Sequence, residues 1–323
     1  MQPKKSAVKY RTFLLYRPTL LLLLILGGCA SQPTLTQIAA FGVATESLAE
    51  NAEKGYALVD EKVVQRNLYF LANDTSSGPT DKDFEGLVGA QGLSKEQAKA
   101  LAARMEALNR LGTYASGLNK LATANFQEDI DDAALRLNGA LTGLVESHKE
   151  LSDSSESIMN QQSIGLVASA INAIGRTIVE KKRRDAIRTV IVEANPAVQS
   201  VAELIGKELA EKGGAGDAAA KAVRTSEGIL KLQYNKDRKS PQSTFDERLA
   251  KLERIQQIHQ DAEDTEGFFL AVGQAANQVA ITHGILLSEV KKDKFTSAEI
   301  AKSIGELVNQ AKAVRAFYQD LQE

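Results

Sequence analysis

Three histidines are the side chains in this sequence best suited to metal binding or proton transfer. His148, His259 and His283 each fall on or beside the apolar repeat of a predicted helix. A metal site on helices usually adds a second ligand three or four residues from the histidine. Only His259 meets that spacing, with Glu263 four residues on, and it has no third ligand nearby. The pattern favours polar residues that set helix register, and it predicts no metal and no cofactor.

A glycine-rich stretch, Gly214-Ala215-Gly216-Asp217-Ala218-Ala219, matches the Ala-ended form of the dinucleotide-binding fingerprint. That fingerprint must follow a strand, whereas here a helical pattern ends at Lys212. We therefore predict a turn with Asp217 as the N-cap of the next helix. No phosphate-binding loop, nucleophile elbow or His-Glu-x-x-His motif is present in the sequence. The remaining carboxylates are scattered along charged helices, so we predict that the chain is not an enzyme.

The single thiol, Cys29, follows Leu26-Gly27-Gly28 near the start of the chain. The first 17 residues carry five basic side chains and no acidic one, and an apolar run of about ten residues follows. A membrane-spanning helix needs about 20 residues. A basic stretch, a short apolar run and small residues before a cleavage site are typical of a secretory signal.

The Leu26-Gly27-Gly28-Cys29 sequence resembles the lipobox of bacterial lipoproteins. The resemblance implies cleavage between Gly28 and Cys29, diacylglycerol on the thiol and often an acyl chain such as palmitate on the new amine. Two or three acyl chains anchor a protein stably in a bilayer. Ala30 stands where an inner-membrane lipoprotein of Gram-negative bacteria tends to have Asp, which favours the outer membrane. An uncleaved transmembrane anchor and an ordinary secreted protein with a free thiol remain as alternatives.

Loss of residues 1–28 would leave an acidic protein. The chain has 39 basic and 41 acidic residues, and five of the basic ones lie in this segment, so the mature chain carries 34 against 41, or −7. Nucleic-acid binding requires a basic surface, so no nucleic-acid partner is expected. The mature chain has no cysteine except Cys29, so its stability must come from packing.

The composition and the apolar repeats predict an all-α protein. Aromatic residues make up 5% of the chain, Trp is absent, and alternating strand patterns are missing. Apolar residues recur instead at steps of three and four, most regularly over 130–158. Pro196 is expected to end or kink a helix. We predict residues 29–33 as a lipidated tether and 34–323 as one elongated antiparallel bundle of six to eight helices. The predicted helices cover 33–73, 94–125, 128–158, 163–195, 197–212, 217–234, 243–291 and 296–317.

The segment 163–179 is apolar and carries one charge, Arg176. A helix that is apolar on all sides is buried, so one interpretation is the central helix of the bundle. The other is a membrane-inserting hairpin, with Arg176 and Lys181–Arg184 at the lipid headgroups. The residues on which both interpretations depend are Ile164, Val167, Ile171, Ile174 and Arg176.

These observations lead to two main functional hypotheses. The first is a bacterial envelope lipoprotein, held to the lipid bilayer by acylated Cys29, that serves as a non-enzymatic helical interaction or structural module. Its partner would be another envelope protein, which the sequence does not identify. The alternative is a membrane-active protein that inserts segment 163–179, as pore-forming proteins do. An enzyme or small-ligand binder is a third hypothesis, and almost nothing in the sequence supports it.

Overall fold

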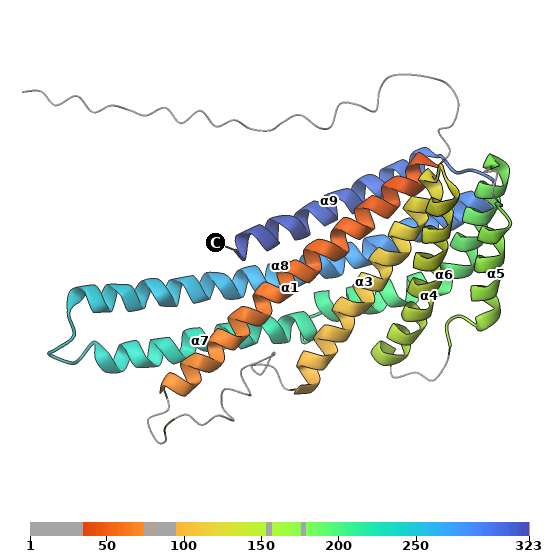
Figure 1. Ribbon diagram of the computed structural model, residues 1–323. Helices are drawn as coiled ribbons and strands as arrows, with labels where there is room; N and C mark the ends of the chain where they lie inside the picture. The colour runs from red at the N-terminus through yellow and green to blue at the C-terminus, as the bar shows by residue number, and fades with distance from the viewer. Residues whose placement is uncertain (1–34, 74–77, 79–94, 153–156, 176–178, 323) are drawn as a thin grey trace, which may run out of the picture. The chain divides into compact units, whose positions relative to one another are not determined.

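Residues 35–73, 78, 95–152, 157–175 and 179–322 are described by the computed structural model (Figure 1). The predicted signal peptide, Cys29, the tether and Arg176 lie outside these residues. Every regular element in the described part is a helix, and the helices pack as a bundle, which confirms the all-α prediction. The helices are α1 (Thr36–Asn73), α3 (Lys95–Thr123), α4 (Gln127–Ser152), α5 (Gln161–Asn172), α6 (Glu180–Ala210), α7 (Ala215–Asp237), α8 (Phe245–Lys291) and α9 (Ala298–Asp320).

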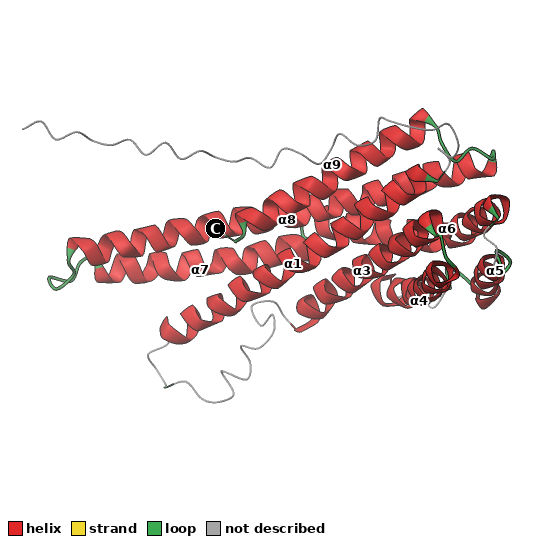
Figure 2. Cartoon of the chain, turned by 45° about the horizontal axis from the view of Figure 1, so that its top comes forward, coloured by secondary structure: helices red, strands yellow, loops and turns green. Residues whose placement is uncertain are grey.

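Helix α8 organises the bundle because it is long enough to pack against several partners in turn (Figures 1 and 2). Its 47 residues correspond to about 70 Å at 1.5 Å per residue. One end pairs with α7, and the rest packs against α6, α9 and α1. The start of α8 is fixed by a capping box, in which Thr244 and Glu247 each bond the other's backbone N–H.

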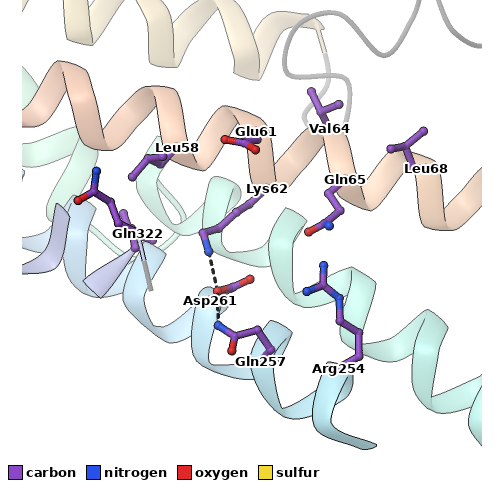
Figure 3. A pocket seen from close by; sticks show the side chains of 11 residues that line it. Leu58, Glu61, Lys62, Val64, Gln65, Leu68, Arg254, Gln257, Asp261 and Gln322 are labelled. Carbon is purple, nitrogen blue, oxygen red and sulfur yellow. Dashed lines mark hydrogen bonds and ion pairs between the residues drawn. The ribbon is translucent and has the colours of Figure 1, made fainter. Parts of the chain in front are cut away.

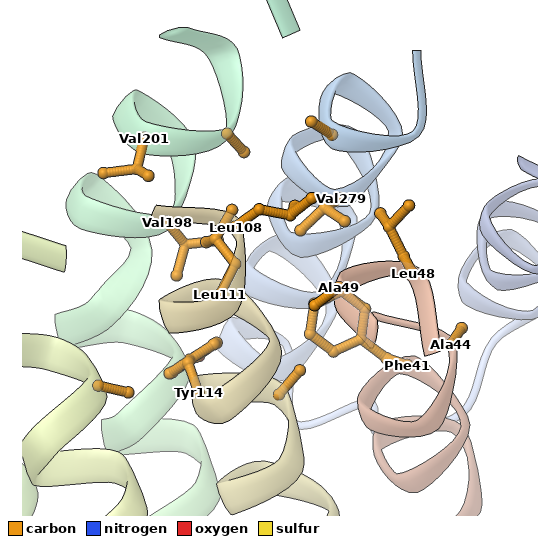
Figure 4. Packing of buried hydrophobic residues seen from close by; sticks show 14 of the residues in the cluster. Phe41, Ala44, Leu48, Ala49, Leu108, Leu111, Tyr114, Val198, Val201 and Val279 are labelled. Atoms are coloured by element: carbon orange, nitrogen blue, oxygen red, sulfur yellow. The ribbon is translucent and has the colours of Figure 1, made fainter. Parts of the chain in front are cut away.

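The core forms where α1, α3, α6 and α8 meet (Figure 4). Phe41, Leu48, Leu111, Val198 and Val279 are fully buried there. Burial of a side chain of this size contributes about 1.5–3 kcal/mol to stability. The aliphatic composition of the sequence thus supplies a continuous apolar centre.

The turn between α6 and α7 is formed by residues 211–214, so only Gly214 of the glycine-rich stretch belongs to it, and residues 215–219 already form the start of α7. Gly213 has a φ of +91°, a conformation that side chains other than glycine rarely adopt. Gly214 is the N-cap of α7, so the prediction that Asp217 takes that position is wrong. Asp217 lies in the first turn of α7 and accepts a hydrogen bond from the Gly213 N–H at 2.8 Å.

Pro196 neither ends a helix nor separates two, because α6 continues through it from Glu180 to Ala210. The residues around it, Ile191, Ala194, Ala197 and Val198, are all fully buried. Packing on these neighbours outweighs the backbone hydrogen bond that proline cannot donate. The predicted helices 163–195 and 197–212 are therefore replaced by α5 and an uninterrupted α6.

Segment 163–179 is not the central helix of the bundle, which corrects one of its two interpretations. It contributes α5, a helix of 12 residues that packs on the outer side of α6 and α4. Ile164, Val167, Ile171 and Ile174 are buried, whereas Leu166 is 46% exposed. Helix α5 is therefore amphipathic, because its large apolar residues other than Leu166 face the bundle, whereas Gly165 and Ser169 are exposed. Within the described residues, no helix has both the length and the apolar content required to cross a membrane.

Candidate functional site

A groove of about 770 Å³ opens between α1 and α8 at the point where α9 ends (Figure 3). Its size falls within the range of about 300–1,000 Å³ that is usual for binding clefts. The lining residues are Leu58, Glu61, Lys62, Val64, Gln65 and Leu68 from α1, Arg254, Gln257 and Asp261 from α8, and Leu321 and Gln322 after α9.

The groove continues the path that α9 follows between α1 and α8. At one end of this path, Gln37 of α1 and Ser297, the N-cap of α9, exchange two hydrogen bonds of 3.2 and 3.1 Å. Further along, Phe317 of α9 packs against Gly267 of α8. Leu321 then closes the path with an exposed fraction of 3%. The groove exists because α9 has 23 residues and α8 has 47, so α8 extends well beyond α9.

An ion pair crosses the floor of the groove (Figure 3). Lys62 Nζ lies 2.6 Å from Asp261 Oδ1, and the two side chains are 17% and 9% exposed. Gln257 Nε2 donates a second hydrogen bond to the same Asp261 oxygen at 3.2 Å. Thr265 Oγ1 donates to the backbone carbonyl of Asp261 at 2.7 Å. The carboxylate is thus held by Gln257, one turn earlier on α8, and by Lys62 of α1.

The walls of the groove carry two charged side chains that have no ionic partner within the part of the chain that the structure describes. Arg254 Nε donates to the Tyr69 hydroxyl at 2.6 Å, and its guanidinium carbon lies 5.7 Å from the Tyr69 ring centre. Among the described residues, neither Arg254 nor the exposed Glu61 forms an ion pair. Leu68 on α1 is 44% exposed. The groove therefore combines a cation, an anion and an apolar surface.

A second polar cluster lies in the core, around His283. The His283 ring is fully buried, its Nε2 lies 2.8 Å from the Tyr114 hydroxyl, and its Nδ1 lies 3.1 Å from Asn195 Oδ1. With an amide oxygen at Nδ1, the neutral ring carries its proton on Nδ1 and accepts a hydrogen bond from the Tyr114 hydroxyl at Nε2. Burial lowers the pKa of His283 to about 3 and raises the pKa of Tyr114 well above its usual range.

The His283 cluster joins helices rather than serving as an open site. Tyr114 belongs to α3, Asn195 to α6 and His283 to α8, and the Phe41 ring of α1 lies 6.0 Å from the imidazole. Tyr114 and His283 have exposed fractions of 1% and 0%. A neutral, hydrogen-bonded histidine at this meeting of four helices suits the register-setting role expected from the sequence.

The other two histidines lie away from the core. His259 is exposed, with Nδ1 3.2 Å from Glu227 and Nε2 3.4 Å from Glu263. Glu263 is thus close to His259, as the four-residue spacing predicts. His259 itself is exposed and does not lie on the buried seam, contrary to the prediction. His148 is half-buried, and burial lowers its pKa. Within the described residues, no three His, Cys, Asp or Glu side chains form a group that could hold a metal ion.

Sequence reasoning did not find the groove. Lys62 and Asp261 lie 199 residues apart, and neither belongs to a motif. The signal that could have revealed it is the difference in length between the predicted helices 243–291 and 296–317, which leaves part of the longer one without a partner. No family model, no curated protein and no solved structure matches the chain. The groove is therefore the candidate functional site on geometric grounds alone.

Proposed function

We propose that this chain is a bacterial envelope lipoprotein, anchored through acylated Cys29, that acts as a non-enzymatic helical interaction module. The observation that carries the interaction role is the groove between α1 and α8, which α9 leaves open. The proposal of anchoring, with the outer membrane favoured by Ala30, rests on the Leu26-Gly27-Gly28-Cys29 sequence.

The position of the groove along α1 supports this combination. Helix α1 begins at Thr36, whereas the groove begins at Leu58, 22 residues later. At 1.5 Å per residue, this is about 33 Å along the helix. This length of helix before the groove supports a module whose N-terminal end follows the proposed anchor and whose groove contacts a protein partner. The proposed partner is therefore another protein of the envelope.

Anchoring is tested by replacement of the lipidated residue. Cys29→Ser in the full-length chain should move the protein from the membrane fraction to the soluble fraction and abolish incorporation of labelled palmitate. Equal membrane retention of the variant and the parent would contradict the lipoprotein proposal.

The interaction role is tested by photo-crosslinking in intact cells. A photoreactive amino acid replaces Gln65 in the groove or, as a control, Leu135, which is 75% exposed on α4. We expect a defined crosslinked product from position 65 that is missing from position 135. Products of equal yield from both positions, or none from position 65, would argue against the groove as the contact site.

The membrane-inserting alternative has no specific observation in its favour. Ile164, Val167, Ile171 and Ile174, on which it depends, are packed into the core of the bundle. Insertion would require these contacts to be broken first. We therefore do not put it forward as a second function.

A further inference from the structure

We infer that the groove is the docking site of an amphipathic helix from a partner protein. That helix carries an acidic residue that meets Arg254 and, about two turns away, a basic residue that meets Glu61. The inference rests on the proposed interaction role of the groove and names the class of partner.

The shape of the groove fits a helix because a helix already occupies the rest of the same path. α9 packs between α1 and α8 up to Leu321, and the two walls continue beyond it. The α1 wall of the groove runs from Leu58 to Leu68, about 15 Å or three helical turns. A docked helix would therefore extend the packing of α9 along α8.

The charges of the groove select the partner. Helices α1 and α8 are antiparallel here, since Lys62 pairs with Asp261 and Tyr69 with Arg254. Lys62 and Asp261 neutralise each other, which leaves Glu61 and Arg254 to attract opposite charges. Arg254 lies level with Tyr69, eight residues or about 12 Å along α1 from Glu61. Residues seven or eight apart lie on one face of a helix, so a single helix can place one residue opposite each of the two charges.

The apolar residues of the groove define the rest of the docking face. Leu58 and Val64 are half-buried and Leu68 is 44% exposed, all on the α1 wall between or beside the two charges. A helix that docks in a groove usually inserts apolar residues at positions i, i+3 or i+4, and i+7. The expected partner sequence therefore has leucine-like residues at this spacing, flanked by one acidic and one basic residue on the same face.

Synthetic helices of about five turns serve as the probe, with the full-length protein in detergent. Both peptides carry leucines at i, i+3, i+4 and i+7. One has Lys and Glu seven residues apart on the same face, and the other has Lys at both positions. Fluorescence anisotropy should show about tenfold weaker binding of the Lys/Lys peptide. Arg254→Glu should reverse this preference, because the wall is then acidic at both positions.

Leu68→Glu tests the apolar part of the face and should weaken binding of the Lys/Glu peptide about tenfold. Leu135→Glu, on an exposed position of α4, is the matched control and should leave binding unchanged. Circular dichroism of each variant reports whether the fold is intact.

Three results would overturn the inference. The first is equal affinity for the two peptides, and the second is equal loss of binding in Leu68→Glu and Leu135→Glu. The third is a dimer of the parent protein that Leu68→Glu dissociates, because a second copy would then occupy the groove. These outcomes are independent of the anchor, so failure of the lipoprotein proposal would be seen only in the fractionation of Cys29→Ser.

Discussion

Helix α8 carries two polar clusters that accommodate charge in opposite ways. At His283 the ring is sealed among four helices and neutral, with a pKa lowered to about 3. At Asp261, 22 residues earlier, a carboxylate and the Lys62 ammonium remain partly open to the groove. The two clusters lie on the same helix but differ in how completely the neighbouring helices cover them.

The number of helices packed around α8 determines how deeply each cluster is buried. α1, α3 and α6 all contribute a side chain around His283, and water is excluded. Around Asp261 the cover of α9 has ended, so one side is left to the groove. Full burial penalises a charge by several pKa units, whereas partial burial tolerates a paired one. The same helix therefore has a fully covered part around His283 and a part at Asp261 that borders the groove.

The largest predicted effect is a loss of folding stability at acidic pH, and it comes from the His283 cluster. The pKa of His283 is about 3 in the folded protein and about 6.5 in the unfolded chain, so the unfolded chain takes up the proton first as the pH falls. The contribution of the neutral His283 ring to the free energy of unfolding is therefore complete above about pH 6.5 and decreases as the pH falls towards 3. Urea unfolding should show a loss of about 3 kcal/mol from this group between pH 7 and pH 4.

His283→Gln is the control for this measurement, because glutamine retains hydrogen-bonding capacity but does not titrate. The variant is less stable at pH 7, and its stability should fall less steeply between pH 7 and pH 4 than that of the parent protein. An identical slope in both proteins would show that His283 is not the group responsible.

Loss of one partner of the groove ion pair should have the next largest effect. The Asp261 side chain is only 9% exposed, and Lys62→Met removes its cation. We expect the free energy of unfolding to fall by about 3 kcal/mol. The double variant Lys62→Met/Asp261→Leu removes both charges and should recover most of that loss. Urea unfolding at pH 7 measures both. A single variant as stable as the double one would mean that water already solvates this carboxylate.

The sequence predicted the covered part of α8 better than the part at the groove. Leu249, Leu252, Val272 and His283 all lie on the apolar repeat of the predicted helix 243–291, and Val272 and His283 are fully buried where several helices meet. Leu249 and Leu252 are instead 42% and 44% exposed. Periodicity reveals which residues share a face of a helix, but whether that face is covered depends on the length of the neighbouring helices.

The same limit explains the errors elsewhere in the bundle. Over 130–158 the heptad positions Leu137, Leu141 and Leu144 are buried as predicted, but α4 ends at Ser152. The composition of segment 163–179 suggested a central helix, because a count of apolar residues does not reveal that they point to one side. The pairs Lys62–Asp261 and Tyr114–His283 join distant parts of the chain, and no local pattern encodes them.

A smaller effect is expected from the hydroxyl that binds His283. Tyr114→Phe keeps the buried ring and removes the donor to Nε2, which leaves a buried acceptor unsatisfied and costs about 1–2 kcal/mol. Tyr318→Phe, whose hydroxyl accepts an exposed hydrogen bond from Gln322, should change stability by less than about 0.5 kcal/mol. Thermal unfolding at pH 7 distinguishes the two. Equal shifts would indicate that the hydrogen bond to His283 contributes no more than one at the surface.

The smallest effect on stability is expected for a charge placed in the groove. Leu68→Glu puts a carboxylate on a residue that is 44% exposed, so the free energy of unfolding should change by about 0.5 kcal/mol or less. Leu48→Ala, a truncation at a fully buried position of the same helix, should cost about 2–5 kcal/mol. If Leu68→Glu proved as destabilising as Leu48→Ala, residue 68 would be part of the core, and the groove would be a packing defect instead of a surface that is free to bind a partner.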